Sequence, residues 1–115
     1  MKDIENRIEY RGQSLRLVFN LNVMEVIQHE YGTLQKWADK LLHMGDEPDV
    51  TAVIFGFREM LNEGIDMDNE EDCTNKEPLT KKQVGRILTE VGLAEVTKMM
   101  MGTVSDSAQS AEKNG

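Results

Sequence analysis

The chain has 115 residues and a formal net charge of −8, from 21 acidic and 13 basic side chains. Nucleic-acid binding draws most of its affinity from Lys and Arg side chains that neutralise phosphates, and these residues do not cluster in the sequence, so a nucleic-acid partner is not expected. Hydrophobic residues make up 39% and charged residues 30% of the chain, which is typical of one globular domain and argues against global disorder.

The cysteine content and the distribution of apolar residues predict a cytoplasmic protein. Cys73 is the only cysteine, so no internal disulfide can form, and a single thiol suits a reducing compartment. The N-terminal segment lacks the apolar stretch of a secretory signal. No window approaches the roughly 18 consecutive apolar residues that span a bilayer, so no membrane association is expected.

Residues 4–20 predict a β-hairpin. Apolar residues at every second position place Leu15, Leu17 and Phe19 on one face of a strand, and Gly12 supplies the turn that precedes it. A lone hairpin is only marginally stable in water, so we expect this one to pack against helices.

Two short helices are predicted next. Asn22 is the expected N-cap of the first, with Glu25 as its capping-box partner, and Gly32 is its natural end. Thr33 can cap the second helix, which is expected to end at Gly45. Both carry apolar residues at helical spacing. These stripes are Val23, Val26, Ile27 and Tyr31 in the first helix, and Leu34, Trp37, Ala38 and Leu41 in the second.

The clearest helical pattern follows a loop at residues 46–49. Its apolar residues fall within a narrow arc at about 100° per residue. They are Val50, Val53, Ile54, Phe57 and Leu61. We expect this helix to end between Asn62 and Gly64, because the residues from Ile65 to Pro78 are acidic and show no periodicity. That segment is predicted to be a solvated loop.

Start signals for a fourth helix coincide at one position. Thr80 is the expected cap, Gln83 completes a capping box, and Leu79 can pack on Val84 as a hydrophobic staple. Gly92 separates this helix from a fifth. The stripes expected to be buried are Val84, Ile87, Leu88 and Val91, followed by Leu93, Val96, Met100 and Val104.

The predicted fold is therefore mainly α. It is a single compact domain of about five short helices with an N-terminal β-hairpin, over residues 1–104. Residues 105–115 are small and polar and predict a disordered tail.

The acidic segment has the register of a calcium-binding loop. Oxygen-bearing side chains occupy the ligand positions of such a loop. They are Asp66, Asp68, Glu70, Asp72, Thr74 and Glu77. However, Glu71 stands where the sharp turn of such a loop requires glycine. A plain solvated loop is the simpler interpretation, and we expect neither a metal nor a cofactor.

The sequence predicts no enzymatic activity. His29 and His43 adjoin no cysteine or serine nucleophile and repeat no metal-ligand spacing, and there is no glycine-rich phosphate loop. The two helices joined at Gly92 could form a helix-turn-helix. The second of them, however, offers one Lys and no Arg, Asn or Gln to base edges.

Two apolar features exceed what a core requires. Phe55 lies about 140° from Val50 around the third helix, on its polar side. Met99, Met100 and Met101 are consecutive, so a helix cannot bury all three against one neighbour. Since the flexible thioether suits surfaces that accept several partners, these four residues are the predicted protein-binding site. The alternative is that neighbours cover Phe55 and that the methionines fill an irregular core.

The elements follow one another in a characteristic order. An alternating strand (SLRLVF) leads into a helix that ends in Glu30-Tyr31-Gly32, and a Trp-containing helix and the apolar helix VTAVIFGFREML follow. The closing segment, PLTKKQVGRILTEVGLAEVTKMM, is the strongest part of the pattern. From about Ile8 to Val104, this order resembles the tail assembly chaperones of siphophages and related prophage elements.

This resemblance implies a function in protein binding. In that family the protein binds the phage tape measure protein, keeps it soluble, recruits tail tube protein, and is absent from the mature virion. The implied location is the cytoplasm of the host cell, and a homo-oligomer is compatible with the sequence. Many members have a longer form made by ribosomal frameshifting, and Glu112-Lys113-Asn114 can be encoded by a slippery heptamer. The alternative function is a small regulatory or adaptor domain, including a helix-turn-helix DNA-binding regulator.

Overall fold

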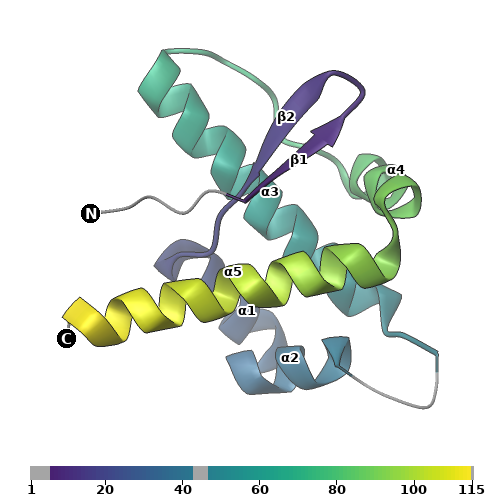
Figure 1. Ribbon diagram of the computed structural model, residues 1–115, viewed down its shortest axis with the longest axis vertical. Coiled ribbons are helices and arrows are strands. Elements are labelled where there is room, and N and C mark those ends of the chain that lie inside the picture. The colour runs from purple at the N-terminus through teal and green to yellow at the C-terminus, as the bar shows by residue number, and fades with distance from the viewer. Residues whose placement is uncertain (1–5, 43–46, 115) are drawn as a thin grey trace.

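The computed structural model describes residues 6–42 and 47–114, with side chains described through Ser107. In these residues an N-terminal hairpin is followed by five α-helices in one globule (Figure 1), which confirms the predicted fold class. The strands are β1 (Asn6–Tyr10) and β2 (Gln13–Leu17), and the helices are α1 (Leu21–Tyr31), α2 (Leu34–Leu41), α3 (Val50–Asp72), α4 (Lys81–Val91) and α5 (Leu93–Asn114).

The hairpin reverses through a two-residue turn. Arg11 and Gly12 both have positive φ, 50° and 81°, which is the turn whose twist matches that of the adjoining strands. The antiparallel register pairs Ile8 with Leu15. These two residues and Leu17 are buried, so one face of the hairpin packs against the helices, as the alternation in the sequence predicts.

α3 is the central element, and it packs against β2 and against each of the other four helices. Two glycines allow these close approaches. A Cβ atom at Gly56 would overlap the indole ring of Trp37, and a Cβ at Gly64 would overlap the main-chain oxygen of Arg16. Glycine is therefore required at both positions for the ring of Trp37 and the edge of β2 to lie directly on α3.

The predicted end of α3 between Asn62 and Gly64 is wrong. The helix continues to Asp72, so most of the segment predicted to be a loop is helical. Gly64 is not a stop signal, because it lies mid-helix where β2 packs. Ile65, just beyond it, is buried. The helix ends at Cys73, which has a φ of 55° in the left-handed region.

The connection from α3 to α4 is held against α3 by two asparagines. Asn62 accepts from the main-chain N–H of Leu79 at 2.8 Å and donates to the carbonyl of Leu79 at 3.2 Å. Two helical turns further on, Asn69 makes the same pair of bonds with Lys76, at 3.0 and 2.9 Å. Each side-chain amide thus hydrogen-bonds both the main-chain N–H and the carbonyl of one residue in the connection, as a neighbouring strand would.

Most of the predicted helix caps are confirmed. Thr33 accepts from the N–H of Lys36, and Thr80 and Gln83 form the predicted capping box. Gly32 and Gly92 end α1 and α4 with positive φ. The predicted end of α2 at Gly45 lies outside the described residues, and the described helix ends at Leu41.

The predicted cap of α1 is wrong. Asn20, not Asn22, accepts from the N–H of Val23 and begins the helix. The side chain of Asn20 also donates to the Glu63 carboxylate of α3 at 2.7 Å, and Asn22 donates to the same carboxylate at 3.1 Å. These bonds join the start of α1 to α3, and they involve a residue more than forty positions away that local sequence does not indicate.

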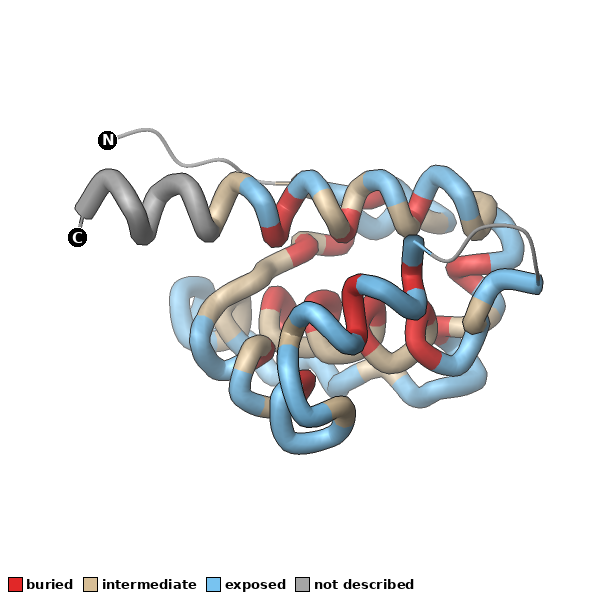
Figure 2. Tube along the Cα trace, turned by 90° about the horizontal axis from the view of Figure 1, so that it is seen from below, coloured by how far each residue is buried: buried red, intermediate tan, exposed pale blue. Residues whose placement is uncertain are grey.

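α5 crosses the globule and continues past Val104, where the sequence predicts a disordered tail (Figures 1 and 2). Its buried stripe is Val96, Met100 and Val104. The Ser107 hydroxyl donates to the carbonyl of Phe19 at 2.9 Å, so the packed domain extends beyond the predicted boundary at residue 104. Figure 2 shows the buried residues gathered between α5 and the remaining elements.

Trp37 lies at the centre of the core. Its side chain is fully buried, and its indole Nε1–H donates to the carbonyl of Ala52 at 3.1 Å. This hydrogen bond and the close approach of the ring to Gly56 together define the orientation of α2 on α3.

Across the described part of the chain, none of the helices combines the length and the apolarity that crossing a bilayer requires.

Candidate functional site

The predicted methionine surface does not form. Met100 is 0% exposed and faces the core beside Gly56. Met99 and Met101 lie about 100° to either side of it on α5, and both are half-buried and pack against the core. Met100 therefore cannot contact a partner in this structure. The physical reason is that α5 lies on the globule along its Val96–Met100–Val104 stripe.

Phe55 is half-buried, not a free anchor. Its ring packs edge-on against Tyr31 at the end of α1, with ring centroids 5.5 Å apart and an interplanar angle of 74°. Such T-shaped pairs are favourable beyond the apolar area they bury. Phe55 therefore joins α1 to α3 and supports Tyr31, which itself lies at the surface.

The acidic segment is not a calcium loop. Asp66, Asp68, Glu70 and Asp72 lie on α3, where a helix directs their side chains outward at different angles and cannot wrap them around one ion. Among the described residues, no group of three or more His, Cys, Asp or Glu side chains is arranged to hold a metal ion. His29 and Cys73 are exposed, and His43 lies outside the described residues.

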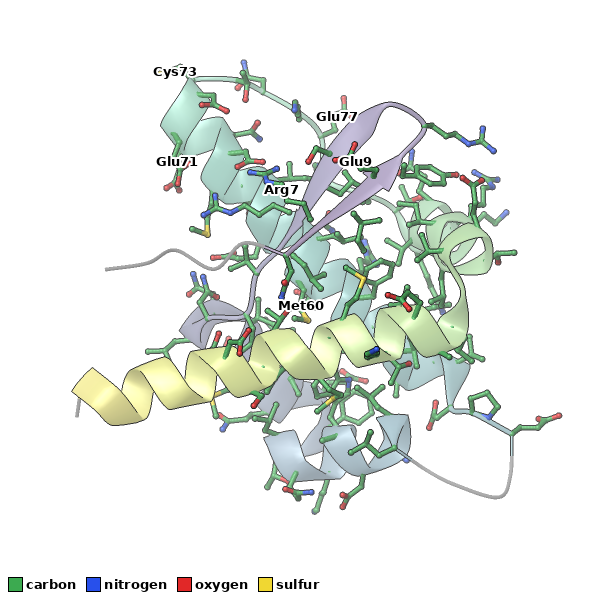
Figure 3. All side chains as sticks on the ribbon, in the orientation of Figure 1. Arg7, Glu9, Met60, Glu71, Cys73 and Glu77 are labelled. Atoms are coloured by element: carbon green, nitrogen blue, oxygen red, sulfur yellow. The ribbon has the colours of Figure 1, made fainter. Side chains whose placement is uncertain are left out.

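Charged residues of the hairpin meet the acidic end of α3 (Figure 3). Arg16 lies 3.2 Å from the Asp68 carboxylate and 3.5 Å from that of Glu71, and Arg7 lies 3.9 Å from Asp68. Carboxylates near a helix C-terminus oppose the helix dipole, so these two arginines supply the charge that the last turns of α3 lack. The ion pairs of Arg7 and Arg16 with Asp68 and Glu71 therefore stabilise the C-terminal end of α3.

An open hollow lies where the end of α1, α2 and the start of α3 meet. It has a volume of about 900 Å³. Its lining consists of Tyr31, Lys36, Asp39, Lys40, Glu47, Pro48 and Asp49. Asp49 caps α3 by accepting from the N–H of Ala52 at 3.0 Å, and its carboxylate lies 3.8 Å from the amine of Lys40. This ion pair joins the end of α2 to the start of α3.

Two apolar side chains are exposed at the same end of the molecule. Leu42 follows α2 and is 55% exposed, and Val50 begins α3 and is 44% exposed. Figure 1 shows the C-terminal end of α2 beside the N-terminal end of α3. We refer to Leu42, Val50 and the hollow together as the α2–α3 end. A third exposed apolar residue, Leu21, lies apart from it at the start of α1 and is 80% exposed.

Leu42 and Val50 are not among the residues predicted from sequence. Val50 belongs to the apolar stripe of α3, which predicts its burial, but it is the first residue of the helix and stays exposed, while Ala52 and Val53 of the same turn are buried. Its place directly after the Asp49 cap is the signal that could have identified it, because the first residue of a helix commonly lies outside the core. Leu42 follows the last residue of a regular stripe, and no sequence signal separates it from Leu41.

The Tyr31 hydroxyl at the hollow is influenced by two nearby carboxylates. Burial raises the pKa of the Tyr31 hydroxyl above its ordinary value, and the negative charges of Asp49 and Glu30 raise this pKa further. Val50 directly follows Asp49 of the lining, and Leu42 follows Lys40 of the lining by two residues.

A second groove, of about 480 Å³, lies between β2 and the connection that precedes α4. Leu15 and Ile65 form the apolar part of its lining. Arg16 and Asp68, which pair with each other, form the charged part.

Comparison of the chain with protein-family models, curated proteins and solved structures finds no match in any of the three. What the protein binds must therefore be inferred from its own surface.

Proposed function

We propose that this protein works by binding other proteins, without catalysis, as a tail assembly chaperone of a siphophage or a related prophage. In this role it binds the tape measure protein in the host cytoplasm, keeps it soluble and helps to recruit tail tube protein. It is released before the virion is complete. The order of a hairpin and five helices, on which the resemblance to that family is based, supports this proposal.

The observation that carries the proposal is the exposure of Leu42 and Val50 beside the hollow at the α2–α3 end. Most of the other large apolar side chains that are described are buried or half-buried. Exposed apolar groups gathered beside a concave surface are typical of places where partner proteins dock. The Tyr31–Phe55 pair gives this end a rigid support, which limits the entropy lost on binding.

The small apolar area suits reversible binding. Fully burying a Val or Leu side chain contributes about 1.5–3 kcal/mol, and Leu42 and Val50 are already about half covered. Covering the remainder by helical segments of the tape measure contributes roughly 1 kcal/mol for each side chain. A chaperone that leaves the finished particle needs contacts that are individually weak. The net charge of −8 keeps such a complex soluble.

Co-expression with the tape measure protein tests the proposal. The candidate tape measure protein, the one that the proposal expects to be encoded beside this chain, is produced alone or together with it, and its soluble fraction is measured after centrifugation. We expect the tape measure to be soluble, and to co-purify with this chain, only in the co-expression. A tape measure that precipitates equally in both cases would contradict the proposal.

A further inference from the structure

Among the described residues, carboxylates outnumber amines in the lining of the hollow at the α2–α3 end. Its lining contains Asp39, Glu47 and Asp49 against Lys36 and Lys40, and Glu30 acts on Tyr31 from the end of α1. Asp49 already pairs with Lys40, and Asp39 accepts from the Gln35 amide at 2.7 Å. Glu47 is exposed and makes no ion pair within the described residues.

We propose that the hollow binds a Lys or Arg side chain of the partner, next to apolar side chains that cover Leu42 and Val50. The proposal rests on the proposed function, because it assigns the partner of that function to this surface. The occupant is thus a segment whose apolar residues are flanked by basic ones.

Two features of the lining support this choice of partner. The first is charge complementarity, since a basic side chain in the hollow offsets the excess of carboxylates and gains affinity and orientation from it. The second is the position of Glu47, an exposed carboxylate of the lining that makes no ion pair within the described residues. An acidic partner segment would meet like charges at the same place and be repelled.

The experiment compares two synthetic peptides. Both are amphipathic, about 15 residues long and identical on their leucine face, but one carries Lys and the other Glu on the opposite face. Each is titrated into ¹⁵N-labelled full-length protein at about 50 mM and at about 500 mM NaCl, which changes the range of exposed charge interactions. We expect the Lys peptide to shift the amide resonances of Tyr31, Lys36 and Val50. We also expect it to bind about tenfold more tightly than the Glu peptide at low salt, with a smaller difference at high salt.

Two variants with the same charge change localise the effect. Glu47→Lys reverses an exposed carboxylate that lines the hollow. Glu70→Lys does the same on α3 roughly 30 Å further along the helix, at 1.5 Å per residue. We expect Glu47→Lys to weaken binding of the Lys peptide about fivefold at low salt and Glu70→Lys to leave it nearly unchanged. Burial of Trp37, read from its fluorescence, verifies that both variants are folded.

The possible outcomes separate this inference from the proposed function. Equal binding of the two peptides at the α2–α3 end would overturn the basic-partner inference and leave that end as a protein-binding surface. An equal loss in both variants would also overturn it, because the effect would then come from net charge. Resonance shifts confined to other residues, or none with either peptide, would overturn this inference. The proposed function is contradicted by a different result, a tape measure protein that neither becomes soluble nor co-purifies when it is co-expressed with this chain.

Discussion

At the scale of single residues, two glycines of α3 set the packing of the whole fold. Gly56 admits the indole ring of Trp37 and Gly64 admits the main chain of β2. Neither a rigid indole ring nor a strand paired with its neighbour can move aside as a flexible side chain could. These positions therefore resist substitution more strongly than glycines elsewhere in the helices.

Gly64→Ala is expected to lower the free energy of unfolding by about 2–3 kcal/mol, because the new methyl group displaces the β2 main chain at Arg16. Gly85→Ala in α4 is the control. A Cβ there meets no atom within 4 Å, so this change should raise the free energy of unfolding by about 0.5–1 kcal/mol. Urea denaturation followed by Trp37 fluorescence measures both. Equal effects of the two substitutions would show that β2 does not pack on α3 at this point.

Cys73→Gly is expected to stabilise the protein by about 0.5–1 kcal/mol. Cys73 ends α3 with a φ of 55°, a conformation that glycine adopts without the steric cost of a Cβ. Cys73→Ala removes the same exposed thiol but keeps the strain, so it should give no gain. Thermal melting under reducing conditions distinguishes the two variants. A gain of similar size in Cys73→Ala would point to the thiol and not to the backbone.

Glu59 makes stability depend on pH. Burial raises its pKa above the ordinary value, with Arg58 lowering it and Glu63 raising it. A group whose pKa is higher in the folded than in the unfolded chain contributes stability at pH values below its unfolded pKa. That stability is lost as the pH rises through its folded pKa. Glu59→Gln should therefore raise the melting temperature at neutral pH, and its advantage should shrink as the pH falls through the carboxylate range. An advantage that is constant with pH would contradict this explanation.

At the scale of elements, α3 depends on partners that are distant in sequence. Its last turns carry acidic residues and no basic one, which opposes the helix dipole. Arg16 of β2, whose side chain is 15% exposed, pairs with Asp68, which is 18% exposed. Low exposure makes this pair less screened by solvent than an ordinary surface pair.

Arg16→Met is expected to loosen the end of α3. The substitution keeps the aliphatic stem but leaves Asp68 and Glu71 without this cation, so amide hydrogen exchange of residues 68–72 should accelerate. Stability should fall by about 1–2 kcal/mol, between the values for exposed and buried pairs. Arg11→Met is the control, because Arg11 and its partner Glu90 are both largely exposed. Unchanged exchange in Arg16→Met would show that helix propensity alone holds these turns.

The predictable part of the fold is the part that is encoded locally. The strand alternation, the caps at Thr33 and Thr80 and the stops at Gly32 and Gly92 each depend on neighbours within about four residues, and all of them are confirmed. The second half of α3 was not predictable in this way. There a packing glycine has the same local pattern as a stop signal, and the compensating arginines come from the hairpin.

For the predicted binding residues too, local periodicity predicts one part of the result and contacts between distant elements decide the other. The stripe through Val96 and Val104 predicts the burial of Met100, and this periodicity outweighs the argument from three consecutive methionines. Periodicity also places Phe55 on the outer side of α3. It does not reveal that Tyr31, twenty-four positions earlier, covers that ring. Contacts between elements decide which apolar residues remain exposed, and these contacts follow from the packing.

At the scale of the whole molecule, the surface combines an overall negative charge with a few exposed apolar side chains. The charge discourages self-association and aggregation. Leu42 and Val50 at the α2–α3 end supply a place where a partner can gain hydrophobic contact. Leu21 is even more exposed but lies at the start of α1, away from the hollow, and so provides a matched control.

The most direct test of the proposed partner surface is the affinity of the proposed tape measure partner for a variant with Leu42→Ser and Val50→Ser. Both side chains are about half exposed, so the change should cost little stability, while binding measured by calorimetry should weaken about tenfold or more. Leu21→Ser, with its side chain 80% exposed, should bind like the unmodified protein. Undiminished binding by the folded double variant would contradict the assignment of the α2–α3 end as the partner surface.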